Sequence, residues 1–240
     1  MAGRAPWDPI RPRARKLVRP VRPDPGGLTG PTPNQVRGPR WRATSKGLFV
    51  PAGVDGSVPE QRVLERSMLL PIGGAVTGWA GLLLARAAYF DGLHPDGVTL
   101  RPVPLLVGPG QSRRPRDGIR WLQDRLDPAE VWHPHGIPAA RPLRSLFDEM
   151  RAAGDERRAA VAMDMAAAAE VATIRRMRDY IAARSGWTGV PLVRRGLDLA
   201  DECSRSPGES RTRLVWILET PYPRPAVTRA SGTWVWRCSG

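Results

Sequence analysis

The side chains of this sequence that are best suited to chemistry are arginines that occur in two short groups. One group surrounds Trp41, and the other lies in the glycine- and proline-rich segment GPGQSRRPRDG. The six arginines are Arg37, Arg40, Arg42, Arg113, Arg114 and Arg116. Arginine presents a planar fork of N–H donors that matches the geometry of a phosphate group. The pattern predicts contacts with nucleic-acid phosphates, although basic turns that face only water have the same pattern.

One carboxylate, Glu209, lies near the start of a predicted helix and has two interpretations. The letters SPGE at residues 206–209 are typical of a capping box, in which the serine and glutamate side chains accept each other's backbone N–H groups. A helix acid can instead help to hold Mg²⁺ when further carboxylates converge on it. We expect the capping role. A nuclease would need acids from a partner chain or from Asp198, Asp201 and Glu202.

No other group of side chains predicts a metal site or a covalent nucleophile. His133 and His135 alternate in WHPHG, but two histidines fall short of the ligands of a zinc site. The segment GPGQSRRPRDG lacks the Gly-Lys-Ser ending of a nucleotide-binding loop. The sequence therefore predicts no metal ligands and no cofactor, and Mg²⁺ belongs only to the nuclease interpretation.

The composition favours a polyanionic partner. The 240 residues carry a formal net charge of +14, and the only lysines are Lys16 and Lys46. Such an excess attracts nucleic acid or anionic lipid over a Debye length of about 8 Å. A GC-rich coding sequence also produces a preference for arginine, so the usage alone does not establish phosphate binding. Two cysteines, Cys203 and Cys238, form no disulfide framework, which favours a reducing, cytoplasmic compartment.

The uncharged stretch SMLLPIGGAVTGWAGLLLA, residues 67–85, approaches the length of about 20 residues that spans a membrane. Proline, glycine and threonine interrupt it, and the part after Thr77 predicts a short buried helix instead. The N-terminal segment MAGRAPWDPIRPRARKLVRP is basic without an apolar core, so it is not a secretory signal. We expect no membrane segment and no membrane partner.

The remaining patterns predict an α+β fold. Residues 1–26 are rich in proline and arginine and read as a disordered basic tail. In residues 27–56, a short helix capped by Thr32, a basic turn and a strand GLFVPA resemble the end of a winged helix–turn–helix. Residues 57–140 predict a mixed body of two helices and three strand-like runs. The runs cover residues 98–108, 117–126 and 130–140, and the basic segment between the first two is a phosphate-binding loop or a solvated hairpin tip.

Residues 141–203 predict a helical module. Apolar side chains follow the i, i+3, i+4 and i+7 spacing of one helix face. They are Leu143, Leu146, Phe147 and Met150. Asp155 and Thr173 are the predicted caps of the next two helices, and VPLVRRGLDLADE is the fourth.

Several phrases together resemble a family of actinobacterial proteins that are antitoxin-like (type IV, abortive infection) and carry a domain similar to very-short-patch-repair endonucleases. The phrases lie within residues 27–225 and are RGPRWRATSKGLFVPAG, TGWAGLLLARAAYFDG, GIPAARPLRSLFDEMRAAGDERRAAVAMDMAAAAEV, GWTGVPLVRRGLDLADECSRSPGESRTRLVWIL and PYPRP. The resemblance implies that Glu209 opens a restriction-endonuclease-like domain, beside carboxylates that hold Mg²⁺. It also implies an antitoxin that represses its own operon and has a cognate toxin protein as a partner.

The sequence departs from this family after Pro225. No carboxylate follows Glu219 and no lysine follows Lys46, so we expect an incomplete endonuclease-like domain over residues 204–240. A frameshift or premature stop would explain the departure, and another reading frame downstream would then encode the missing acids. The predicted function is association with nucleic acid, above all DNA, without catalysis. The alternatives are a Mg²⁺-dependent DNA endonuclease, an antitoxin and transcriptional repressor, and a remnant without function.

Overall fold

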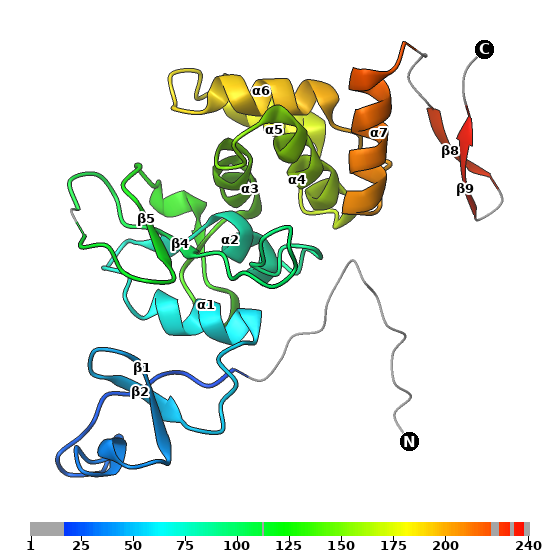
Figure 1. Ribbon diagram of the computed structural model, residues 1–240. Coiled ribbons are helices and arrows are strands. Elements are labelled where there is room, and N and C mark those ends of the chain that lie inside the picture. Colours follow the sequence, from blue (N-terminus) through cyan, green and yellow to red (C-terminus); the bar gives the residue numbers. More distant parts are fainter. Residues whose placement is uncertain (1–16, 112, 222–225, 231–232, 238–240) are drawn as a thin grey trace. The chain divides into compact units, whose positions relative to one another are not determined.

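A computed structural model describes residues 17–111, 113–221, 226–230 and 233–237 (Figure 1). The chain divides into two compact units. The sheet unit contains the described residues up to 84 and residues 90–141, and the helical unit contains residues 85–89 and the described residues from 142 onward. Helices and strands occupy largely separate parts of the chain, so the protein has the predicted α+β fold.

A small hairpin begins the sheet unit. Strand β1 (Trp41–Ser45) pairs antiparallel with β2 (Leu48–Pro51), and the turn between them contains Lys46 and Gly47. The only helical element among residues 27–56 is the short 3₁₀ helix η1 (Gln35–Arg37). Trp41 and Arg42, which were predicted in a basic turn, therefore lie in a strand.

Residues 17–24 have defined partners, which their composition did not indicate. The side chain of Gln61 donates to the carbonyl of Val18 at 2.8 Å and accepts from its N–H at 2.9 Å, as a neighbouring strand would. Val21 forms an antiparallel bridge with Phe49 of β2. The carboxylate of Asp24 then accepts three backbone N–H groups and closes a turn. The segment is thus attached to the hairpin and to the helix that carries Gln61.

The main sheet has five strands in the order β5-β4-β3-β7-β6. The strands are β3 (Ala75–Val76), β4 (Val103–Leu106), β5 (Ile119–Leu122), β6 (Val131–Trp132) and β7 (Ala139–Ala140). All three predicted strand-like runs contribute to it. Because β4 and β5 pair in parallel, the basic segment between them cannot be the tip of a hairpin, and that alternative is wrong.

The apolar stretch at residues 67–85 folds into the sheet unit. It begins at the end of α1 (Pro59–Ser67), contributes β3 and ends just after α2 (Gly78–Leu84). Trp79 of α2 is buried, and its indole N–H donates to the carbonyl of Pro102 at 2.9 Å. Among the described residues, no helix combines the length and the apolar character needed to cross a membrane.

Helix α2 is shorter than the sequence predicted. The apolar phrase TGWAGLLLARAAYF, residues 77–90, predicts one helix, whereas α2 ends at Leu84. Arg86 and Tyr89 have φ angles of 64° and 68°, in the left-handed region that a right-handed helix cannot include. The backbone conformation at these two residues is therefore incompatible with a continuous helix.

The helical unit contains α3 (Pro142–Arg151), α4 (Glu156–Ala168), α5 (Ile174–Ala182), α6 (Val190–Leu199) and α7 (Pro207–Glu219). The predicted caps are confirmed, because the side chains of Asp155 and Thr173 accept the backbone N–H three residues later. Helix α4 packs against α3, α6 and α7. After α7, strands β8 (Ala226–Ala230) and β9 (Thr233–Arg237) pair antiparallel.

Candidate nucleic-acid interface

The basic segment at residues 107–118, which we call the basic connection, joins β4 to β5. Two parallel strands can be joined only by a chain that returns along the length of the sheet. The N–H of Val107 donates to the carbonyl of Leu122 at 2.8 Å, and the carbonyl of Gly118 accepts from Val103 at 2.9 Å. Both ends of the connection are therefore fixed to opposite ends of the β4–β5 pair.

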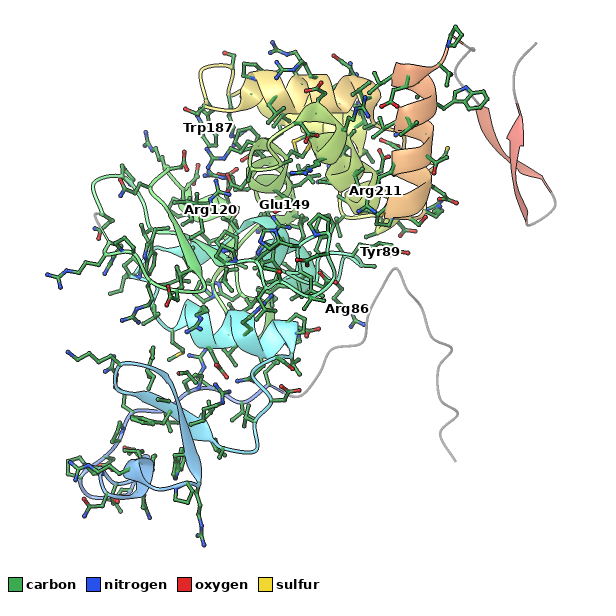
Figure 2. The ribbon with its side chains drawn as sticks, in the orientation of Figure 1. Arg86, Tyr89, Arg120, Glu149, Trp187 and Arg211 are labelled. Carbon is green, nitrogen blue, oxygen red and sulfur yellow. The ribbon has the colours of Figure 1, made fainter. Side chains whose placement is uncertain are left out.

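The middle of the basic connection is attached to the edge of the sheet. The indole N–H of Trp121, on the edge strand β5, donates to the carbonyl of Arg114 at 3.0 Å. Arg113, Arg114 and Arg116 are exposed, and so is Arg120, which Figure 2 labels. Among the described residues, no carboxylate forms an ion pair with these four guanidinium groups. The connection thus holds a group of arginines whose charge is available to an anionic ligand.

Arg120 belongs to this group although the sequence interpretation did not include it. It follows the basic segment by only a few residues, inside a run that reads as a strand. Side chains alternate between the two faces of a strand. Arg120 is exposed between buried Ile119 and half-buried Trp121, and this alternation was the signal that could have identified it.

The other three predicted arginines lie on the hairpin. Arg37 ends η1, and the carbonyl of Arg40 accepts from the N–H of Ala52 at 2.8 Å, which places both at the open end of the hairpin. Both side chains are exposed. Arg42 is only partly exposed, and its guanidinium binds the buried Glu65 carboxylate at 2.6 Å. That hydrogen bond raises the pKa of Arg42, so its charge is already used in the fold.

The capping box at the start of α7 is confirmed. The Ser206 hydroxyl accepts from the N–H of Glu209 at 3.2 Å. The Glu209 carboxylate accepts in turn from the N–H groups of Ser206 at 3.1 Å and Arg205 at 2.6 Å. One oxygen of the carboxylate that a nuclease would use is therefore occupied by the backbone.

The acids upstream of Glu209 each have a different partner. Asp198 forms an ion pair with Arg178 at 3.0 Å. Asp201 accepts from the N–H of Cys203, and Glu202 from the N–H of Ile174. In the part of the chain that the structure describes, no three His, Cys, Asp or Glu side chains are arranged to hold a metal ion. His133 and His135 are exposed on either side of Pro134.

Glu209→Ala is expected to lower the free energy of unfolding by about 1 kcal/mol, the usual value of a helix N-terminal cap. The alanine leaves the N–H groups of Arg205 and Ser206 without their acceptor. Glu209→Gln is the matched control, because glutamine also completes a capping box and should retain most of the stability. Urea unfolding followed by circular dichroism measures both. Equal losses in the two variants would contradict a role based on hydrogen bonding alone.

Comparisons of this chain with protein-family models, with curated proteins and with solved structures gave no match. The functional conclusion therefore depends on the geometry and charge of the chain itself. The geometry and the charge together describe a protein whose arginine-rich connection is anchored at the edge of a mixed sheet.

Proposed function

We propose that this protein binds nucleic acid, above all DNA, and does so without catalysing a reaction. The observation that supports the proposal is the group of exposed arginines on the basic connection and on β5. Arginine contacts with phosphates supply most of the sequence-independent affinity of proteins for DNA. A connection fixed to the sheet at its ends and its middle presents these contacts without a large ordering cost on binding.

The net charge of each unit is compatible with a polyanionic partner. The described residues of the sheet unit contain 15 basic and 10 acidic side chains. The described residues of the helical unit, 85–89, 142–221, 226–230 and 233–237, contain 16 basic and 12 acidic residues. Both units therefore carry a net positive charge that attracts a polyanion, and the position of the exposed arginines distinguishes the sheet unit.

The triple variant Arg113→Ala/Arg114→Ala/Arg116→Ala tests the proposal. Affinity for a fluorescein-labelled DNA duplex is measured by anisotropy over a series of salt concentrations. The logarithm of the association constant should fall less steeply with the logarithm of salt, by about 0.9 for each lost phosphate contact. The slope should therefore decrease by about 2 to 3, with a loss of affinity on the order of 100-fold at moderate salt.

A second triple variant that removes the same charge elsewhere is the control. Arg175 and Arg176 on α5 and Arg194 on α6 are exposed, and their replacement by alanine also lowers the net charge by three. We expect this variant to bind DNA with nearly the slope of the original protein. Equal slopes in the two triple variants would mean that net charge, and not the basic connection, determines binding. A salt-independent affinity in the original protein would contradict the proposal altogether.

The finer interpretations of the sequence stay predictions. These are the winged-helix-like segment at residues 27–56, the endonuclease-like domain at residues 204–240 and an antitoxin with a cognate toxin. The proposed binding needs no cofactor. A plasmid-nicking assay with Mg²⁺, with Glu209→Gln as control, tests the nuclease alternative, and Mg²⁺-dependent nicking lost in the Gln variant would support it over the present proposal.

A further inference from the structure

A second basic element lies directly beside the basic connection. Arg66 of α1 donates from Nη1 to the carbonyl of Thr44 in β1 at 3.0 Å. Its Nη2 and Nε lie 3.4 and 3.5 Å from the place that a Cβ on Gly118 would occupy. Arg66 therefore reaches both the hairpin, next to its turn, and the end of the basic connection. Two segments far apart in the sequence are brought to one side chain.

The turn of the hairpin carries two cationic side chains. Lys46 is exposed in the turn itself. Nη1 of Arg22 lies 3.8 Å from the position of a Cβ on Gly47, and Arg22 is exposed. The φ angle of 72° at Gly47 lies in the left-handed region, which explains the glycine. Arg22 and Lys46 thus lie at the same end of the hairpin, the end that Arg66 contacts.

Polar contacts of helix α1 hold strand β1 and the segment that precedes Arg22. Glu65 is only 5% exposed and accepts from Arg42 of β1 and from the amide of Gln61. Gln61 is 3% exposed and holds both backbone polar groups of Val18, on the chain segment that leads to Arg22. Buried hydrogen bonds of this kind are costly to break. The hairpin turn is therefore held in a defined position beside the connection.

We infer that Arg22, Lys46 and Arg66 extend the basic connection into one continuous cationic strip that binds a phosphodiester backbone. The inference rests on the proposed function and adds these three residues to it. Arg22 and Lys46 contact phosphates, and Arg66 is a positioning residue that joins the hairpin to the connection. A strip built from two elements engages several phosphates of one strand at once. Its ligand is therefore a polynucleotide and not a free phosphate or a nucleotide.

The double variant Arg22→Ala/Lys46→Ala tests the strip. With the same labelled duplex, the salt dependence should become less steep by about 1.8, because two phosphate contacts are lost. Arg175→Ala/Arg176→Ala removes the same charge from α5 and should leave the slope unchanged. Inorganic phosphate is added as a competitor while the total ionic strength is held constant. It should not displace the duplex. A labelled single strand of the same sequence, measured in parallel, distinguishes a duplex backbone from a single-stranded one.

The positioning role of Arg66 can be tested separately from a general role in stability. In Arg66→Met, the hairpin turn loses its link to the basic connection. Adding Arg22→Ala/Lys46→Ala to this variant should therefore change the salt slope by less than half of the change that the same pair causes in the original protein. Arg66→Lys keeps a donor for the carbonyl of Thr44 and should restore most of the difference. Thermal unfolding monitored by circular dichroism verifies that each variant is folded, and Arg22→Gln/Lys46→Gln replaces the alanine pair if it is not.

Failure of this inference differs from failure of the proposed function. If the triple variant of the basic connection lowers the slope but the Arg22/Lys46 variant matches the original protein, the strip is wrong and the connection alone binds. Effective competition by inorganic phosphate would also overturn it. If the original protein binds neither the labelled duplex nor the labelled single strand, the proposed function fails and the strip fails with it.

Discussion

Asp164→Ala is expected to lower the free energy of unfolding of the helical unit by about 3–5 kcal/mol. Asp164 of α4 and Arg213 of α7 are both fully buried, with Nη2 of Arg213 2.8 Å from the carboxylate. The Ser210 hydroxyl donates to the same oxygen at 2.6 Å. Truncation removes the nearer, fully buried counter-charge of Arg213 and leaves only the Asp201 carboxylate, 3.9 Å from Nε. A poorly paired buried charge is among the costliest defects in a protein.

The same network fixes the chain between α6 and α7. The other oxygen of Asp164 accepts from the N–H of Asp201 at 2.7 Å, and Nη1 of Arg213 donates to the carbonyl of Leu199 at 2.7 Å. Burial raises the pKa of the Asp164 carboxyl, while hydrogen bonds from Ser210 and the other donors oppose this shift. A single carboxylate therefore connects α4, α7 and the chain that joins α6 to α7.

Urea unfolding of three variants separates the charge effect from other causes. Asp164→Leu/Ser210→Ala/Arg213→Met removes both charges and the hydroxyl together, and it should recover at least half of the stability lost in Asp164→Ala. Glu219→Ala breaks the exposed pair with Arg157, whose side chains are 50% and 44% exposed, and should cost no more than about 1 kcal/mol. If the triple variant is as unstable as Asp164→Ala, the poorly paired charge is not the main cause.

The starts of the helices were predictable because their signals are local. A cap connects a side chain to the backbone three residues later, so Asp155, Thr173 and Ser206 identify themselves in the sequence. The strand-like runs were recognisable for a similar reason, since the turn signals that separate them are local. Pairing direction requires more. Nothing within residues 98–126 specifies that β4 and β5 run parallel, because the order of the whole sheet decides it.

The candidate site was predictable only where its residues are neighbours in sequence. Arg113, Arg114 and Arg116 form a visible run, and the structure keeps them together on one connection. Arg22 lies in the segment that the composition predicted to be disordered, and Lys46 is an isolated basic residue, so only the fold brings them to one turn. Arg42 looked equivalent to the others, but the sequence does not show that Glu65 of α1 faces it. Contacts between distant segments depend on packing, which local patterns do not encode.

Gly196→Val in α6 is expected to destabilise the helical unit by more than about 3 kcal/mol, because overpacking by even one methylene costs about 1–3 kcal/mol. A Cβ at residue 196 would lie 2.7 Å from Cβ of Ala159 and 3.3 Å from the backbone of α4 at Ala159 and Ala160. The obstacle is a helix backbone with its first side-chain atom, which cannot rotate away as a long side chain would. The fully buried alanines of α4 thus let α6 approach so closely that only glycine fits at this position.

Alanine substitution at two glycines tests the direction of the stability change as well as its size. In an exposed helix interior, glycine to alanine usually stabilises by about 1 kcal/mol. Gly196→Ala should do the opposite and lower the midpoint of urea unfolding, since the contact at 2.7 Å is already too short for a methyl group. A Cβ added to Gly186 would have no atom within 4 Å, so Gly186→Ala should be neutral or slightly stabilising. If Gly196→Ala also stabilises the protein, α4 and α6 must be further apart than the structure places them, and the close packing of these helices would have to be abandoned as the basis of the helical unit.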